Sequence, residues 1–201
     1  MILTGERVIP NLMKPENGML REHTARYRFA SKFACGSVLD IACGVGYGTG
    51  LLLNESTVVE NVLGVDIDEI SINYAKIHYS HPKAKYLVKD ALSPYLHDEI
   101  GLFDTVISFE TIEHLKEDAK FVRNLQGLLK PDGALIISTP LGRGRGIACS
   151  DPFHVHQYKE EEFIDLLNCF GSVDMYYQFG ETIEKMVKGK KYYLMVAVCR
   201  H

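Results

Sequence analysis

The sequence predicts an α/β fold: a seven-stranded, mostly parallel sheet with helices on both faces and an antiparallel strand at its C-terminal end. Apolar, β-branched runs alternate along the chain with amphipathic segments, which is the order of a parallel sheet with crossover helices. The runs at 37–42, 103–109 and 134–140 are apolar nearly throughout, as expected for strands covered on both faces. The last two strand candidates are separated by only about eleven residues, which favours a hairpin.

Each element is assigned in chain order from its own pattern. The predicted strands are 37–42, 61–66, 85–90, 103–109, 134–140, 172–179 and 191–199. The predicted helices are 19–33, 46–55, 68–80, 113–130 and 159–169. The helix at 113–130 should end at the Pro131-Asp132-Gly133 turn, and the helix at 19–33 should lie over the open end of the sheet.

Length and composition set the broad class. The 201 residues fit one domain, in which we expect 1–35 to form a lid or cover and 36–201 the main domain. A net charge of −4 provides no basic field for nucleic acid. Five cysteines without a CxxC pair favour a reducing compartment. The start, MILTGERVIP, does not read as a signal peptide, and no apolar run is long enough for a bilayer, so we expect a cytoplasmic protein.

A glycine loop follows the first predicted strand. In CGVGYGTG, Gly44, Gly46, Gly48 and Gly50 allow a ligand to approach the backbone, and the following helix offers free N–H groups. A tight turn that only packs helix on strand is the alternative. Counted from Asp40, the spacing is DxxCGxGxG rather than the dinucleotide GxGxxG, which argues against a nicotinamide dehydrogenase.

Acids accompany three successive strands. Asp40 lies inside the first predicted strand, Asp66 ends the second and Asp90 follows the third. Because the carboxyl ends of parallel strands share one edge, these acids should face one crevice. Asp66 suits the two ribose hydroxyls, and Asp90 suits an adenine amino group. Any one of them alone would be an ordinary turn or N-cap aspartate, but together they predict an adenosine-bearing cofactor.

These motifs resemble those of class I S-adenosylmethionine-dependent methyltransferases that act on small molecules (types 11 and 12). VLDIACGVGYGT is similar to the first motif of that family, GVDID to the second, KDA (89–91) to the third and DTVISFETIEHL to the fourth, over roughly residues 30–199. The resemblance implies a Rossmann-like fold, methyl transfer, and S-adenosyl-L-methionine as cofactor.

The resemblance also implies a set of cofactor-binding residues. They are Tyr27, Asp40, Ala42, Gly44, Gly46, Asp66, Ile67, Asp90, Ala91, Phe109 and Glu110. Asp40 and the glycine backbone would hold the methionine part, and Asp66 the ribose. Ile67, Asp90 and Ala91 would meet adenine. Phe109 and Glu110 would face the sulfonium side.

Groups for chemistry are expected after the fourth and fifth strands and in the N-terminal cover. The GRGRG segment is expected to be mobile, with Arg143 and Arg145 either solvated or facing an anionic acceptor. His154 and His156 are two residues apart, so on an extended segment they share a face and one of them is expected in the site. A structural or surface role is the alternative for each histidine.

The N-terminal segment resembles the lid helix of many small-molecule methyltransferases of this class. His23 and Tyr27 are one helical turn apart and would close over the methionine end of the cofactor. A plain amphipathic cover is the equal alternative.

The segment ETIEH places Glu110, Glu113 and His114 on one helical face. Glu113 and His114 either begin a helix, where acids are favourable, or His114 is a general base, or the three residues bind a divalent metal with His154 or His156. The metal interpretation rests on resemblance to small-RNA 2′-O-methyltransferases, and a similar ExxEH occurs in quinone-biosynthesis O-methyltransferases. Mixed Glu/His ligation suits manganese, iron or zinc better than magnesium.

The leading hypothesis is methylation of a small molecule, more at oxygen than at nitrogen, without a resident metal. The candidate catalytic residues are His114, His154 and His156. The expected partner is a small-molecule acceptor rather than nucleic acid or a membrane. The alternatives are a metal-dependent RNA or quinol O-methyltransferase and a non-catalytic, cofactor-binding partner subunit.

Overall fold

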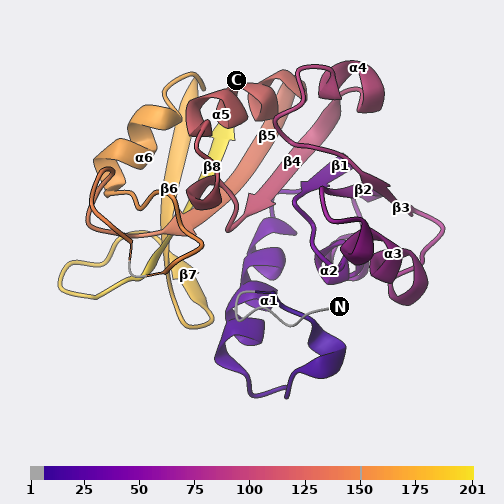
Figure 1. Ribbon diagram of the computed structural model, residues 1–201, viewed down its shortest axis with the longest axis horizontal. Helices are drawn as coiled ribbons and strands as arrows, with labels where there is room; N and C mark the ends of the chain where they lie inside the picture. The colour runs from indigo at the N-terminus through magenta and orange to yellow at the C-terminus, as the bar shows by residue number, and fades with distance from the viewer. Residues whose placement is uncertain (1–6, 150) are drawn as a thin grey trace.

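The computed structural model describes residues 7–149 and 151–201, whose strands form one sheet (Figure 1). The strands are β1 (Gly36–Ile41), β2 (Val59–Asp66), β3 (Ala84–Val88), β4 (Phe103–Phe109), β5 (Leu129–Pro140), β6 (Ser172–Phe179), β7 (Thr182–Glu184) and β8 (Leu194–Arg200). Their order is β3-β2-β1-β4-β5-β8-β6-β7. The first five strands are parallel, while β8 pairs antiparallel with both β5 and β6.

The mostly parallel α/β sheet and its antiparallel end are therefore confirmed, but the sheet has eight strands rather than seven. The extra strand, β7, is a three-residue segment that pairs antiparallel with the end of β6. Its short sequence, TIE, carries too little alternation to be distinguished from a loop.

The helices and 3-10 turns fill the connections. They are η1 (Pro10–Leu12), α1 (Gly18–Ala30), α2 (Tyr47–Glu55), α3 (Glu69–His78), α4 (Leu96–Ile100), η2 (Ile112–His114), α5 (Asp118–Gly127) and α6 (Glu160–Leu166). The prediction of one helix from 113 to 130 that ends at a turn at 131–133 is wrong at both ends. At the start, the carbonyl of Glu113 accepts hydrogen bonds from the N–H groups of Val155 and His156, at 2.9 and 3.0 Å, so it is not available to a longer α-helix and α5 begins only at Asp118. At the end, α5 stops at Gly127, and residues 131–133 lie within β5, where the pairing with β4 shifts register.

The two faces of the sheet each have a core, because successive residues of the central strands point to opposite sides. On one face Leu39, Val106 and Ile137 pack in the same cluster as residues of α5 and α6. On the other, Val38 and Ile107 pack in the same cluster as residues of α1 and α2. This two-sided burial explains why the central strands are apolar throughout.

The chain reverses its direction of winding between β1 and β4, so a crevice forms where these neighbouring parallel strands end. Ala42 and Glu110 lie just past the two strand ends, with φ values of 60° and 49°. Left-handed backbone at a non-glycine residue costs free energy and is concentrated at functional sites. A functional site is therefore expected in this crevice.

Helix α1 reaches this crevice because α2 presents no side chain at Gly48. A Cβ atom at Gly48 would lie only 1.9 Å from the ring of Tyr27. Gly46, in the turn before α2, has φ of 82°, and a Cβ there would lie 2.6 Å from the Cβ of Ala75. These two glycines are therefore needed for close packing.

The GRGRG loop is pinned down rather than free, which corrects the expectation of a mobile loop. Arg145 forms an ion pair with Asp118 at 2.8 Å, and its N–H group donates to the carboxylate of Glu162 at 3.0 Å. Asp118 is buried and also accepts from the hydroxyl of Tyr158 at 3.0 Å. Arg145 is thus committed to the first turn of α5, while the guanidinium of Arg143 donates to the Ala148 carbonyl.

Two predictions concern the N-terminal segment and the surroundings of the chain. The division into a lid (1–35) and a main domain (36–201) stays a prediction, and residues 1–6 of that lid lie outside the described residues. In the part of the chain that the structure describes, we find no helix with the length and apolar character needed to cross a membrane.

The Asp118 anchor generates a prediction about stability. Asp118→Asn leaves Arg145 and Tyr158 without their charged partner, so we expect a loss of about 1–3 kcal/mol in the free energy of unfolding, measured with urea. The matched control is Asp174→Asn, whose exposed ion pairs with Lys185 and Arg200 should contribute less than about 0.5 kcal/mol. Equal effects of the two substitutions would contradict the anchoring role.

Candidate functional site

A cavity of about 640 Å³ opens at the carboxyl ends of the parallel strands, between the sheet edge and α1. Its lining brings together residues that sequence reasoning selected from distant segments. They are His23, Tyr27, Ala42, Gly44, Asp66, Ile67, Phe109, Glu110, Glu113, His114 and His154. The volume is within the range of small-molecule sites.

Asp40 lies behind the cavity wall and carries a buried carboxyl group. It accepts hydrogen bonds from the hydroxyls of Tyr27 and Thr49, each at 3.1 Å. Burial raises the pKa of Asp40 to about 7, against the two hydrogen bonds, which lower it, while the charge of Asp66 raises it further. A ligand cation at this end of the cavity would favour the ionised form. The group therefore suits the ammonium of an amino-acid moiety.

Asp66 and the glycine loop form the next part of the cavity. The carboxylate of Asp66 accepts from the N–H groups of Gly44 at 2.8 Å and Asp68 at 2.9 Å. A Cβ atom at Gly44 would meet nothing within 4 Å, so the backbone there is open to a ligand. Ile67 is 70% exposed beside it, an apolar surface on which a base can stack. This arrangement fits an adenosine group.

Asp90 and Ala91 do not line the cavity, although they were selected for adenine. The Asp90 carboxylate accepts from the N–H group of Leu92 at 2.8 Å and so closes its own turn. Ala91 packs against the core on the α5 face of the sheet. Their roles toward adenine stay predictions. The role of Gly46 toward the methionine part also stays a prediction, because Gly46 does not line the cavity.

Phe109 and Glu110 mark the end of β4. The Phe109 ring packs edge-on against Tyr27, with ring centroids 5.1 Å apart. The Glu110 carboxylate accepts from the hydroxyl of Ser138, at the end of the neighbouring strand β5, at 2.6 Å. The hydrogen bond explains how Glu110 is held at the mouth of the crevice despite its left-handed backbone.

Beyond Glu110, three side chains from two segments converge. Glu113, His114 and His154 each offer a ligand atom, and these atoms lie within 4.8 Å of one another. Glu113 is buried, and Thr139 donates to one of its carboxylate oxygens at 3.1 Å. Its other oxygen has no hydrogen-bond partner among the described residues. Burial, and then the charge of Glu110, raises the pKa of Glu113 well above its usual value.

The two histidines of this group come from η2 and from the loop after β5. The Nδ1 atom of His114 lies 3.0 Å from the Phe153 carbonyl, which can only accept, so Nδ1 carries the proton and Nε2 is the acceptor. Burial, and then the charge of His114, lowers the pKa of His154. Their rings meet edge-on, with centroids 4.8 Å apart. Two imidazoles and a carboxylate make up a base or a ligand set.

His156 is a different case from its neighbour. Its Nε2 atom lies 3.5 Å from the Lys116 carbonyl and 3.8 Å from the Asp118 carboxylate, away from the converging group. Of the two histidines after β5, the structure therefore brings His154 to the cavity and not His156. The third ligand atom beside Glu113 and His114 likewise comes from His154 and not from Glu110.

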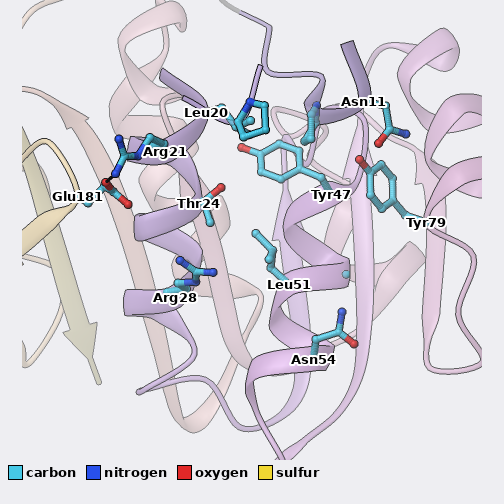
Figure 2. Close-up of a pocket in the computed structure, with 13 residues that line it drawn as sticks. Asn11, Leu20, Arg21, Thr24, Arg28, Tyr47, Leu51, Asn54, Tyr79 and Glu181 are labelled. Carbon is cyan, nitrogen blue, oxygen red and sulfur yellow. Dashed lines mark ion pairs between the residues drawn. The ribbon is translucent and has the colours of Figure 1, made fainter. Parts of the chain in front are cut away.

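A second cavity, of about 560 Å³, lies on the outer side of α1 and α2 (Figure 2). Tyr47, the first residue of α2, lines both cavities and separates them. In Figure 2, Arg21 of α1 faces this outer cavity and pairs with Glu181. The two faces of α1 thus serve two different spaces.

Sequence reasoning did not select Arg26, which the structure places in the lining of the first cavity. It is 2% exposed, and its guanidinium donates to the Gln178 side chain at 2.8 Å. The only feature of the sequence that could have indicated Arg26 is its position next to Tyr27, in a helix that was expected to cover the site. Nothing in the pattern distinguishes it from Arg21 and Arg28, which face outward.

Comparisons with known proteins agree with this geometry. The family described as "Methyltransferase domain" matches residues 39–137. A probable S-adenosylmethionine-dependent methyltransferase of Mycobacterium tuberculosis is 34% identical over 180 residues, covering 87% of this chain and 62% of the relative. The chain thus spans about three fifths of the length of that relative.

One more relative matches about half of this chain, and one solved structure shares its fold. A ubiquinone biosynthesis O-methyltransferase of Pseudomonas aeruginosa is 30% identical over 105 residues, covering 51% of this chain and 43% of the relative. The small RNA methyltransferase HEN1 has the same fold, with a TM-score of 0.72 at 21% identity, over 98% of this chain and 26% of that one.

The buried Asp40 carboxyl predicts a pH dependence of stability. Its pKa in the folded protein is raised, so between about pH 4 and 7 the folded state binds more protons than the unfolded state, and stability falls as pH rises. Asp40→Asn removes this pH-dependent contribution to stability. From pH 5.5 to 8, its free energy of unfolding should therefore gain about 2 kcal/mol relative to the wild type, measured with urea and no ligand.

Asp104→Asn is the control for this measurement. Burial raises the pKa of Asp104, but hydrogen bonds from Lys130 and Ser37 outweigh it and hold the pKa at about 2. The contribution of Asp104 to the free energy of unfolding is therefore constant above pH 5. Its stability difference from the wild type should be the same at both pH values. If the difference in the free energy of unfolding between Asp40→Asn and the wild type were also the same at both pH values, the raised pKa of Asp40 would be refuted.

Proposed function

We propose that this chain is a class I S-adenosylmethionine-dependent methyltransferase that transfers a methyl group to an oxygen atom of a small molecule. The observation that carries the proposal is the convergence of Glu113, His114 and His154 in the same cavity as the glycine loop and Asp66. S-adenosylmethionine supplies the methyl group when bound. A hydroxyl acceptor needs a group that removes its proton, and this cluster offers one.

The cofactor fits the residues on the adenosine and methionine sides. The open backbone at Gly44, the Asp66 carboxylate and the exposed Ile67 suit adenosine. The buried Asp40 carboxyl, behind Tyr27, suits the charge of the ammonium group. Phe109 and Glu110, which we expect on the sulfonium side, line the same cavity as His114 and His154, so the sulfonium methyl group would point toward the cluster.

The chain's own residues would then orient the acceptor, exclude water and move one proton. His114 is the preferred base, because the Phe153 carbonyl fixes its tautomer and leaves Nε2 as the acceptor. His154 packs against it and assists in holding the acceptor hydroxyl. Tyr27 covers the methionine end and excludes water there.

A metal-assisted form of the same reaction is the second candidate, favoured by the unpartnered oxygen of Glu113. Two imidazole nitrogens and one carboxylate oxygen within 4.8 Å of one another fit manganese, iron or zinc. An ion would offset the cost of the buried Glu113 carboxylate and would lower the pKa of the acceptor hydroxyl. The small-RNA and ubiquinone relatives widen the choice of acceptor, but a compact chain with net charge −4 favours a small molecule.

Substitution of His114 tests the base. We expect His114→Ala to lower kcat by about 10²- to 10⁴-fold, because the acceptor proton loses its base. The dissociation constant of S-adenosylhomocysteine, measured by isothermal titration calorimetry, should change less than about threefold, since His114 lies outside the adenosine and methionine parts of the cavity. His156→Ala is the matched control and should retain activity. A wild-type chain that binds the product without turning over any acceptor would instead favour a partner subunit.

Metal titration separates the two candidates. Calorimetry with Mn²⁺ and Zn²⁺ should show one site in the wild type that is lost in Glu113→Gln and His154→Ala if the metal-assisted form holds. Asp151 and Glu110 also lie at the cavity, so Glu110→Gln is included as a neighbouring control. Activity that survives thorough chelation would leave the metal-free base mechanism.

A further inference from the structure

Arg26 differs from the other arginines of α1. Arg21 and Arg28 are exposed and form ion pairs with Glu181 and Glu55, on the outer side of the helix that Figure 2 shows. Arg26 faces the opposite way, into the lining of the first cavity, and is 2% exposed. Within residues 7–149 and 151–201 it has no carboxylate partner at ion-pair distance.

The position of the guanidinium is fixed by one side chain. Its Nη1 atom donates to the Oε1 atom of Gln178, at the end of β6, at 2.8 Å. The amide nitrogen of Gln178 donates to the carbonyls of Glu22 and Gly180, at 3.0 and 2.7 Å, so its oxygen must face Arg26. The Nε atom of Arg26 is buried and has no hydrogen-bond partner in the described chain.

A buried cation of this kind is costly without a counter-charge. Three of the acids that line the cavity have other hydrogen-bond donors: Asp66 accepts from two backbone N–H groups, Glu110 from Ser138 and Glu113 from Thr139. No acid among the described residues forms an ion pair with Arg26. The described chain therefore holds a buried, preorganised guanidinium that makes no direct contact with a carboxylate.

We propose that Arg26 is the counter-charge for a carboxylate group of the bound ligand. The inference rests on the proposed methyltransferase function only for the identity of that ligand. One source of the carboxylate is the amino-acid end of the cofactor, because Arg26 adjoins Tyr27, which covers Asp40. The other is an acid group on the acceptor, because Arg26 also reaches toward β6 and lies in the same lining as Leu194 and Glu113.

Paired ligands test the cofactor as the source. S-adenosylhomocysteine carries the amino-acid end, and 5′-methylthioadenosine lacks it, so their affinity ratio isolates that end. If Arg26 binds the cofactor carboxylate, Arg26→Gln should weaken S-adenosylhomocysteine by about 10- to 100-fold and leave 5′-methylthioadenosine unchanged, measured by calorimetry. Arg26→Lys keeps the charge and should recover part of the loss. Arg21→Gln, on the outer face of the same helix, should change neither affinity.

A second pair tests the acceptor as the source. Salicylate and salicylamide differ in the carboxylate, and both are titrated with and without saturating S-adenosylhomocysteine. If Arg26 reads an acceptor acid, salicylate should bind the wild type at least about tenfold more tightly than salicylamide, and Arg26→Gln should abolish this preference.

The outcomes separate the two proposals. Either a selective loss with S-adenosylhomocysteine or a lost preference for salicylate supports the role of Arg26. Unchanged ratios in both pairs, with the variant folded by circular dichroism, overturn it. A wild type that binds neither nucleoside overturns the proposed function, and the salicylate pair still decides the role of Arg26. If Arg26→Gln fails to fold, Arg26→Met replaces it in both pairs with the same expected outcomes, because methionine also removes the positive charge.

Discussion

The site depends on one buried interaction, the hydrogen bond from Tyr27 to Asp40. It joins the N-terminal helix to the first strand of the sheet, while Thr49 joins the same carboxyl group to α2. A carboxyl group inside a protein is tolerated when donors surround it, and here the donors come from the two helices α1 and α2 that enclose this end of the cavity. The helix α1, the helix α2 after the glycine loop and the strand β1 are therefore connected through one carboxyl group. A ligand that changes the charge of Asp40 would change the hydrogen bonds to both helices.

The charges around the cavity are divided between its two sides. The acidic and imidazole groups follow β4 and β5, where Glu110 is tied to Ser138 and Glu113 to Thr139. The unpaired cation comes from α1 and is fixed by β6. The ends of β4 and β5 are neighbours through parallel pairing, and β6 reaches the site only because β8 inserts antiparallel between β5 and β6. The antiparallel end of the sheet thus helps to shape the cavity, since it places Gln178 against Arg26, which lines it.

The parts predicted from sequence are those that local pattern determines. Apolar strands, the glycine turn and Asp66 at a strand end follow from backbone geometry, and the structure places them together. The parts that were missed depend on long-range contacts. The helix after β4 begins late because the Glu113 carbonyl is taken by a loop some forty residues away, and Arg145 is held by Asp118 rather than facing an acceptor. His154 and His156 are equivalent in sequence, and only the path of the loop after β5 separates them.

Gly48 has a consequence for the evolution of the site. The ring of Tyr27 occupies the space that a side chain at position 48 would need, since a Cβ atom there would lie only 1.9 Å from the ring. The two positions are thus complementary in volume: a methyl group gained at one must be matched by a smaller residue at the other, or the cover cannot close. In an alignment of relatives, positions 27 and 48 should vary as a pair, and a chain that breaks the pairing should have a different cover over its cofactor.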